Sequence, residues 1–229
     1  MVKKIVKKIL SNKRIAKKLE KIALNIHTYS YNLSGILAVY ANNGVHPKHN
    51  ILKYEEWFLN NIEENWVVLD IGCNIGMMAE LLSHKAKFVY GVDIEQKHIE
   101  KADKNIDREN TKFICADATT LNYKDFSPID CVTLSNVLEH IDKRIGFLKA
   151  LVANIPWRDK QRFLIRVPMI DREWTAVYKK SLGLEYRLDK THFIEYTFDQ
   201  FKSELKQANI KINSYHIRFG EIYAICEGV

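Results

Sequence analysis

The sequence predicts a doubly wound α/β fold with seven strands, a C-terminal antiparallel hairpin and an N-terminal helical extension. A strand-like run ends in the glycine-containing turn Asp70–Gly76, which leads into a helix-forming run. Strand and helix patterns then alternate, which predicts parallel strands joined by right-handed crossover helices. Two final strand-like runs, residues 210–218 and 222–227, flank a turn at Phe219 and Gly220, which predicts the hairpin.

Length and composition are those of an ordinary globular protein. The chain has 229 residues, enough for one α/β domain with an extension, and contains 47% hydrophobic and 28% charged residues. The four cysteines are too widely spaced for a C-x-x-C pair. We therefore expect reduced thiols in a cytoplasmic protein, with neither a disulfide nor a zinc site.

The basic charge is concentrated at the N-terminus. Residues 1–21 contain nine Lys or Arg and one acidic residue, whereas residues 22–229 contain 26 basic and 27 acidic residues. Apolar residues recur at helical spacing between the lysines up to Ile26. Such a helix can pack on the domain with its lysines in water, lie on an anionic membrane or near a lipid-linked substrate, or hold RNA. The sequence leaves these alternatives open.

A turn-forming run, Asn42–Pro47, predicts a boundary between an extension at residues 1–45 and an α/β domain at residues 46–229. Lys7 and Lys8 interrupt the apolar run that a signal peptide requires. Residues 22–45 are too polar for a membrane span. We expect a soluble protein, or one held peripherally at the inner membrane surface.

Residues at the ends of the predicted strands indicate a nucleotide-type ligand. Gly72 and Gly76 allow the backbone to adopt positive φ close to a ligand. No Lys-Ser or Lys-Thr pair follows Gly76, and the spacing is not G-x-G-x-x-G, so neither a Walker loop nor a dinucleotide fingerprint is present. Asp93 ends the second predicted strand, where a carboxylate can accept hydrogen bonds from ribose hydroxyls. Asp117 follows the third strand.

The motif D-x-G-x-x-x-G, followed in order by these two aspartates and the run S-N-V-L-E-H at Ser135–His140, resembles class I S-adenosylmethionine-dependent methyltransferases. The usual middle glycine is Asn74, which tolerates the left-handed region, so we expect a left-handed backbone there. The resemblance covers residues 66–167 and implies a Rossmann-like fold with S-adenosylmethionine as cofactor and S-adenosylhomocysteine as product. The implied cofactor-binding residues are Asp70, Gly72, Cys73, Asn74, Gly76, Asp93, Ile94, Asp117, Ala118, Ser135 and Asn136.

A long connection, residues 168–196, precedes a capping-box pattern at Thr197 and is predicted to be the acceptor lid. The runs N-G-V-H-P-K-H and R-V-P-M-I-D-R-E-W resemble methyltransferases of bacterial surface-glycan biosynthesis, which implies a sugar or glycan acceptor. The aromatic residues of the connection suit sugar rings. The predicted acceptor contacts are Arg166, Trp174, Tyr178 and Arg187.

Methyl transfer to a hydroxyl requires alignment of the reactants and removal of a proton. A histidine is the natural base, and His140 and His192 are both candidates. A subgroup of the family binds magnesium through E-x-x-E-H, but Asn136 replaces the first carboxylate, so we expect no metal. The sequence thus predicts a small-molecule or glycan O-methyltransferase. An RNA methyltransferase that uses the basic tail and a non-catalytic cofactor-binding module are the alternatives.

Overall fold

The computed structural model describes residues 10–229. The first part of the predicted amphipathic stripe, including Val2, Ile5, Val6 and Ile9, lies outside the described residues. The chain divides into two compact units. One contains the chain up to residue 51 together with residues 174–186, and the other contains residues 52–173 and 187–229.

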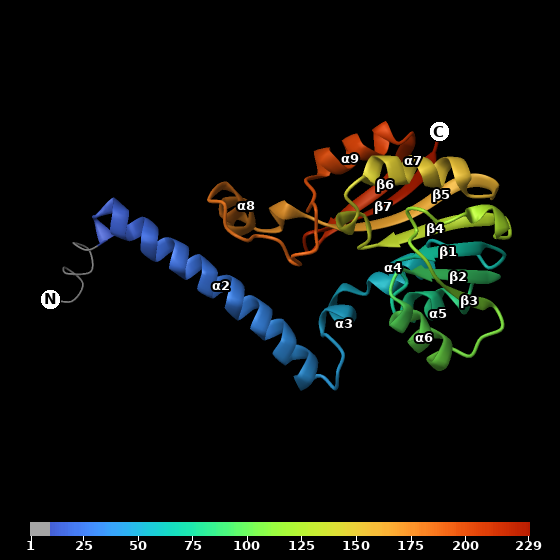
Figure 1. Cartoon of the computed structure of the whole chain (residues 1–229), viewed down its shortest axis with the longest axis horizontal. Helices are drawn as coiled ribbons and strands as arrows, with labels where there is room; N and C mark the ends of the chain where they lie inside the picture. Colours follow the sequence, from blue (N-terminus) through green and yellow to red (C-terminus); the bar gives the residue numbers. More distant parts are fainter. Residues whose placement is uncertain (1–9) are drawn as a thin grey trace. The chain divides into compact units, whose positions relative to one another are not determined.

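The larger unit is built on a seven-stranded sheet with the order β3-β2-β1-β4-β5-β7-β6 (Figure 1). Its first five strands are parallel, and β7 pairs antiparallel with both β5 and β6. This confirms the predicted fold class and the C-terminal hairpin. The strands are β1 (Val67–Ile71), β2 (Phe88–Asp93), β3 (Thr111–Cys115), β4 (Ile129–Ser135), β5 (Trp157–Pro168), β6 (Ile210–Arg218) and β7 (Glu221–Gly228).

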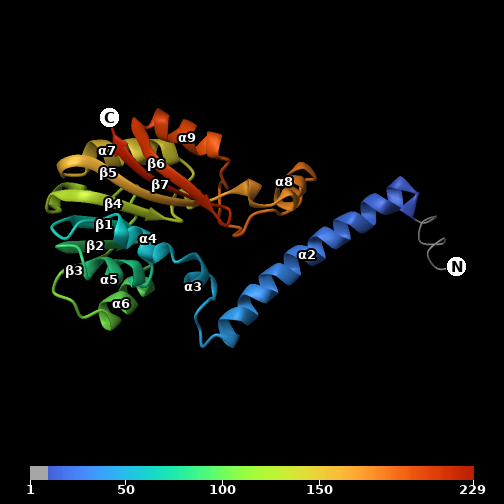
Figure 2. The same cartoon turned by 180° about the vertical axis from the view of Figure 1, so that it is seen from behind.

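Helices cover both faces of this sheet (Figures 1 and 2). They are α4 (Tyr54–Asn60), α5 (Met77–Ser83), α6 (Gln96–Asn105), α7 (Arg144–Asn154) and α9 (Phe198–Gln207), with short 3-10 helices η1 (Tyr123–Asp125), η2 (Leu138–His140) and η3 (Ile170–Arg172). The carboxyl ends of β1 and β4 lie at the point where the strand order reverses. Open α/β sheets bind ligands at that point.

Alternate side chains of β1 enter two hydrophobic cores. Val67, Leu69 and Ile71 pack in the cluster that contains buried residues of α7 and α9, whereas Val68 packs with buried residues of α4 and α5. All of these β1 residues are buried, because a central parallel strand is covered on both faces. The two cores fix the strand ends that carry the predicted site.

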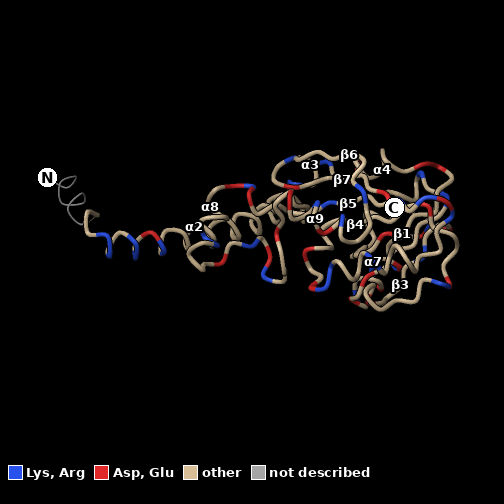
Figure 3. Tube along the Cα trace, turned by 90° about the horizontal axis from the view of Figure 1, so that it is seen from above, with Lys and Arg blue, Asp and Glu red and all other residues tan. Residues whose placement is uncertain are grey.

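The smaller unit contains α2 (Lys13–Ala41), the start of α3 (Lys48–Leu52) and α8 (Trp174–Ser181). The Asn12 side chain caps α2 by accepting hydrogen bonds from two backbone N–H groups. The Lys and Arg residues of α2 lie in its first half (Figure 3). Within the described residues, no helix combines the length and apolar character that crossing a membrane requires.

Part of the predicted lid packs on α2. The Tyr178 hydroxyl donates a 2.8 Å hydrogen bond to Glu20, and Lys179 Nζ lies 2.9 Å from Thr28 Oγ1 and 3.1 Å from His27 Nδ1. These contacts join residues more than 150 positions apart in the chain. Residues 174–186 therefore belong structurally with the N-terminal extension.

Candidate active site

The turn between β1 and α5 has the backbone that its glycines predict. Gly72 and Gly76 have φ of +74° and +84°, and Asn74 has φ of 51°, which confirms the expected left-handed conformation at the non-glycine position. The N–H groups of Gly72 and Cys73 donate to the Val92 carbonyl over 2.7 and 3.1 Å. These bonds tie the turn to the end of β2.

The Asp93 carboxylate also holds this turn. Its Oδ2 accepts a 2.8 Å hydrogen bond from the Asn74 N–H, and its Oδ1 accepts one of 2.9 Å from the Glu95 N–H. His98 Nδ1 lies 3.2 Å from Oδ1. A carboxylate has about four lone-pair positions, so capacity for a ligand hydroxyl is left. Asp93 thus couples the shape of the turn to the ligand-facing end of β2.

A cavity of about 1070 Å³ opens at this edge of the sheet. Seven of the predicted cofactor residues line it, together with His140: Gly72, Asn74, Asp93, Ile94, Asp117, Ala118 and Asn136. The other predicted cofactor residues, which are not among its lining residues, are Asp70, Cys73, Gly76 and Ser135. Further lining residues that sequence reasoning missed are Glu95, His98, Thr119, Val137, Ile141, Asp142, Lys143 and Thr191.

Two features of the cavity wall fit a closely held ligand. A Cβ at Gly72 would lie only 2.6 Å from the Val137 side chain, so the backbone can form this part of the wall only with glycine. Asn136 also has a left-handed backbone, with φ of 56°, and its N–H donates to the Arg166 carbonyl. The buried Asn136 Oδ1 has no hydrogen-bond partner in the structure, which leaves an acceptor for a ligand.

Asp70 lies beneath the turn and is buried. Its Oδ1 accepts a 2.6 Å hydrogen bond from the Thr133 hydroxyl, whereas its Oδ2 has no partner. Burial raises the pKa of Asp70 to about 7; the Thr133 hydrogen bond opposes this rise, and the negative charge of Asp93 adds to it. Asp70 therefore links the carboxyl ends of β1 and β4.

The two histidines that the sequence proposed as bases lie together. Their rings meet edge to face with centroids 4.7 Å apart, although they are 52 positions apart in the sequence. His140 is exposed at the cavity wall, and His192 is buried. Glu139 lies beside them and is fully buried, and within residues 10–229 neither of its carboxylate oxygens has a hydrogen-bond partner. Burial raises the pKa of Glu139 to about 8.

A hydrogen-bond chain orients His140. The Thr191 hydroxyl lies 2.7 Å from Asp189 Oδ1 and 3.0 Å from His140 Nδ1. Because the hydroxyl has a single proton, donation to Asp189 requires His140 Nδ1–H to be the donor to Thr191. The lone pair of His140 is then on Nε2. Burial, followed by the proximity of His192, lowers the pKa of His140, which favours this neutral form.

A second chain orients His192. Its Nδ1 lies 3.2 Å from Glu195 Oε1, and Glu195 also accepts hydrogen bonds from the Arg172 guanidinium and the Leu188 N–H. Burial opposes ionisation of Glu195, but these donors hold its pKa below the usual value. The ionised Glu195 accepts a hydrogen bond from the Nδ1–H of His192, which fixes the orientation of the ring.

Among the described residues, Glu139, His140 and His192 are the group that could hold a metal ion, with potential ligand atoms within 4.8 Å of one another. They offer one carboxylate and two imidazole nitrogens. Asn136 is the residue that replaces the first carboxylate of the magnesium-binding pattern. The absence of metal dependence stays a prediction.

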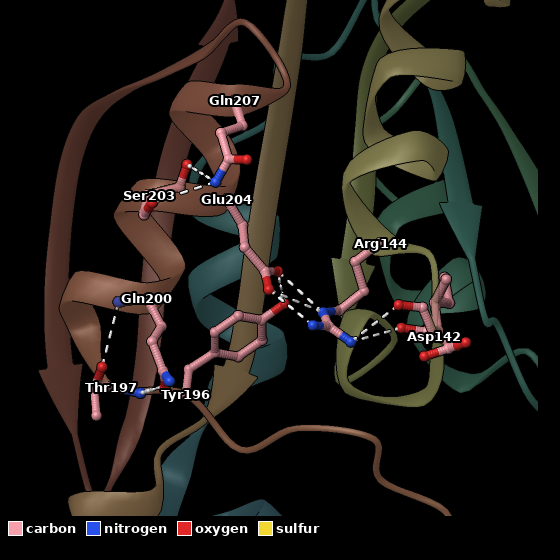
Figure 4. A network of polar contacts seen from close by, with 9 residues as sticks. Asp142, Arg144, Tyr196, Thr197, Gln200, Ser203, Glu204 and Gln207 are labelled. Carbon is pink, nitrogen blue, oxygen red and sulfur yellow. Dashed lines mark hydrogen bonds and ion pairs between the residues drawn. The ribbon is translucent and has the colours of Figure 1, made fainter.

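An ion-pair network outside the predicted site supports the cavity wall (Figure 4). Arg144 at the start of α7 forms a bidentate pair with Glu204 of α9, with distances of 3.0 Å from Nε and 2.8 Å from Nη2. Its Nη1 donates to the carbonyls of Ile141 and Asp142, two cavity residues. The Tyr196 hydroxyl completes the network by donating to Glu204.

The predicted acceptor contacts lie in different places. Arg166 is buried, with its guanidinium 3.6 Å from the Tyr54 ring centroid, and is not among the residues that line the cavity. Arg187 Nη1 donates to the His192 carbonyl and so holds the histidine loop. Trp174 and Tyr178 belong to the smaller unit, where Trp174 is exposed. Acceptor contact by these four residues stays a prediction.

Comparison with known proteins identifies the domain. Residues 69–153, which include the turn, Asp93 and His140, match the methyltransferase domain family. The part of the chain that lines most of the cavity thus matches a methyltransferase domain. A ubiquinone biosynthesis O-methyltransferase from Coxiella burnetii is 30% identical over 121 residues, covering 52% of this chain and 50% of that protein. The chain thus spans about half the length of the curated relatives it matches.

Solved structures share the fold of this methyltransferase domain. Magnesium protoporphyrin IX methyltransferase from Synechocystis, with bound S-adenosylhomocysteine, has a TM-score of 0.59 at 17% identity and covers 80% of this chain and 83% of its own. A methyltransferase from Methanosarcina mazei has a TM-score of 0.61 at 16% identity, covering 76% and 97%. At these identities the likeness establishes the fold.

Proposed function

We propose that the protein transfers a methyl group from S-adenosylmethionine to a hydroxyl of a small acceptor, with His140 as the general base. The observation that carries this proposal is the position of His140 on the cavity wall, with its Nδ1 bound to Thr191 and its Nε2 lone pair left for a substrate proton. The cofactor supplies a methyl group already activated by its sulfonium. The chain must therefore align the acceptor and remove its proton.

The cavity residues divide this work. Asp93 and the Asn74 backbone form the rim where the ribose hydroxyls are expected, and Asp117, which also lines the cavity, is the proposed acceptor for the adenine amine. Asn136 lies on the same wall as His140 and offers its unpartnered Oδ1 to a polar group. His140 Nε2 accepts the proton of the acceptor hydroxyl as the new oxygen–carbon bond forms, and its exposure allows the proton to pass to solvent.

Two observations support an oxygen acceptor. A neutral histidine oriented by the Asp189–Thr191 chain is suited to deprotonating a hydroxyl. The curated relatives include O-methyltransferases by name. We retain a sugar or glycan hydroxyl as the acceptor implied by the sequence resemblance. The relatives supply a second acceptor class, a hydroxyl on an intermediate of ubiquinone biosynthesis.

RNA methylation and a non-catalytic cofactor-binding role are the competing functions. The RNA function rests on the basic residues of the extension, so it requires RNA binding that weakens with salt and disappears when residues 1–21 are deleted. A non-catalytic cofactor-binding protein would bind S-adenosylmethionine but would transfer its methyl group to no acceptor. A cytoplasmic location is part of the proposal.

The test is a methyl-transfer screen that follows S-adenosylhomocysteine formation. The acceptors are sugar nucleotides, glycans, hydroxylated ring compounds and RNA, with His140→Ala as the control in each reaction. We expect turnover with a hydroxyl acceptor that falls at least 100-fold in the variant. Turnover that is equal in the two proteins would contradict the role of His140, and turnover on RNA alone would contradict the acceptor class.

A further inference from the structure

One face of α2 carries eight large apolar or aromatic side chains at heptad spacing. None of them is buried, and their exposed fractions range from 39% for Leu33 to 81% for Tyr40. At about 100° per residue they occupy one side of the helix, and at 1.5 Å per residue they extend over roughly 38 Å. Alternating steps of four and three residues separate these eight positions along the chain. We call them together the α2 seam: Ile15, Leu19, Ile22, Ile26, Tyr29, Leu33, Ile36 and Tyr40.

The side-chain hydrogen bonds that join α2 to α8 lie on the other side of α2. Glu20, His27 and Thr28 bind Tyr178 and Lys179 of α8 through their side chains. With about 100° per residue, these three positions lie on the side of the helix opposite the seam. α8 packing therefore leaves the seam exposed.

We propose that the α2 seam pairs with the α2 seam of a second copy of this chain as an antiparallel coiled coil. A repeat of four and three residues, or 3.5 on average, keeps an apolar seam facing a partner helix along its length. An amphipathic helix that only rests on a surface needs an apolar face and no heptad register. The sustained register over eight positions therefore points to a helix as the partner.

The seam is complementary to itself in the antiparallel direction. When Ile26 of one copy faces Tyr29 of the other, the remaining positions also form layers. Leu19 faces Ile36, Ile22 faces Leu33, and Ile15 faces Tyr40, each in both directions about a two-fold axis between residues 27 and 28. A two-fold interface requires such matching of a surface with its own copy.

Charge selects the antiparallel direction. All five Lys and Arg residues of α2 lie between Lys13 and Lys21, and residues 22–41 contain no Lys, Arg, Asp or Glu. A parallel pair would place the two basic segments side by side. The antiparallel pair separates them and brings each basic segment to the C-terminal end of the partner helix, where the helix dipole is negative.

The oligomeric state of the full chain tests the pairing. In sedimentation equilibrium we expect the wild type at twice its chain mass of 26.8 kDa and Ile26→Glu at the single-chain mass. Ser34→Glu is the matched control, because it adds the same charge to an exposed position of α2 outside the seam. It should remain dimeric. Far-UV circular dichroism checks that α2 folds in each variant, and Leu33→Glu repeats the test at a second layer.

Cysteine cross-linking tests the direction in a Cys115→Ser background. Ile22→Cys combined with Leu33→Cys should form a disulfide-linked dimer, because these positions face each other only in the antiparallel pair. Leu33→Cys alone should not cross-link, since Leu33 would face itself only in a parallel pair. Cross-linking of the single variant overturns the proposed direction.

Two further results would overturn the pairing. One is a wild type that stays at the single-chain mass over the accessible concentration range, including the case in which it binds phosphatidylglycerol vesicles through the seam. The other is a dimer that persists in both Ile26→Glu and Leu33→Glu. Neither result bears on methyl transfer, so the pairing and the proposed function fail independently.

Discussion

The Asp93 carboxylate accepts a 2.8 Å hydrogen bond from the backbone N–H of Asn74, 19 residues earlier in the chain. The residue expected to hold the ribose and the non-glycine residue of the turn are therefore parts of one structure. Asp93 does two tasks: it fixes the left-handed turn, and it presents acceptor oxygens at the cavity rim.

Asp93→Asn should weaken cofactor binding roughly 10- to 100-fold, because charge-assisted hydrogen bonds contribute about 1.5–3 kcal/mol. Equilibrium dialysis with labelled S-adenosylmethionine measures the change. Asp125→Asn, at an exposed position away from the cavity lining, should bind like the wild type. Equal affinities for the Asp93 variant and the wild type would remove Asp93 from the cofactor site.

Asn74→Val should lower the free energy of unfolding by about 1–2 kcal/mol relative to Asn74→Gly, because a β-branched residue is strained at a φ of 51°. Glycine has no such strain, so it is the matched control at the same position. Urea unfolding provides the comparison. Equal stabilities would show that the turn relaxes out of the left-handed conformation.

His140→Ala should reduce kcat by about 100-fold or more while leaving cofactor affinity unchanged. His192→Ala should have a smaller effect on kcat, because His192 is buried and is not among the cavity-lining residues. Because the pKa of His140 lies below 6.5, the base form is present at neutral pH and the rate should fall only in more acidic solution. Stopped assays on the acceptor found in the screen provide kcat and its pH profile.

Treatment with EDTA should leave this turnover unchanged. The Asn136 amide replaces a carboxylate ligand of the magnesium-binding pattern. The measurement is the rate before chelation, after it, and after addition of Mg²⁺ or Zn²⁺. A rate that disappears and returns with one of these ions would assign Glu139, His140 and His192 to a metal site.

Asp70 should make the stability of the fold decrease as pH rises. Its pKa is near 3.8 when unfolded and about 7 in the native state, so the native state binds the extra proton between these values. The free energy of unfolding relative to Asp70→Asn should therefore fall by about 1.4 kcal/mol per pH unit from pH 4 to pH 7 and level off above it. Parallel stability curves for the two proteins would contradict a buried, protonated Asp70.

Local patterns in the sequence were sufficient to predict the sheet, the C-terminal hairpin and the left-handed backbone at Asn74. Strand periodicity, glycine spacing and a turn each depend on neighbouring residues, so they are visible in one stretch of chain. The adjacency of His140 and His192 was not visible, because it depends on how the connection after β5 folds back. The ion pair of Arg144 and Glu204 was also not visible in the sequence, because the two residues are 60 positions apart.

Burial was the other property that the sequence did not provide. Arg166 was expected at the acceptor, and this contact stays a prediction; the sequence did not show that Arg166 would be buried in β5, with its guanidinium over the Tyr54 ring and near Glu221. Glu139 belongs to the run after β4 that the sequence placed at the site, yet it is buried, and its carboxylate has no hydrogen-bond partner among the described residues. A charged residue at a strand end can face either the ligand or the core, and only packing decides between them.

The central claim is that the cavity bounded by Asp93, Asn136 and His140 binds S-adenosylmethionine for methyl transfer. Titration calorimetry of the full wild-type chain with S-adenosylmethionine tests it most directly. We expect one cofactor per chain and competition by S-adenosylhomocysteine. A folded wild-type protein that shows no binding to either molecule would contradict the claim.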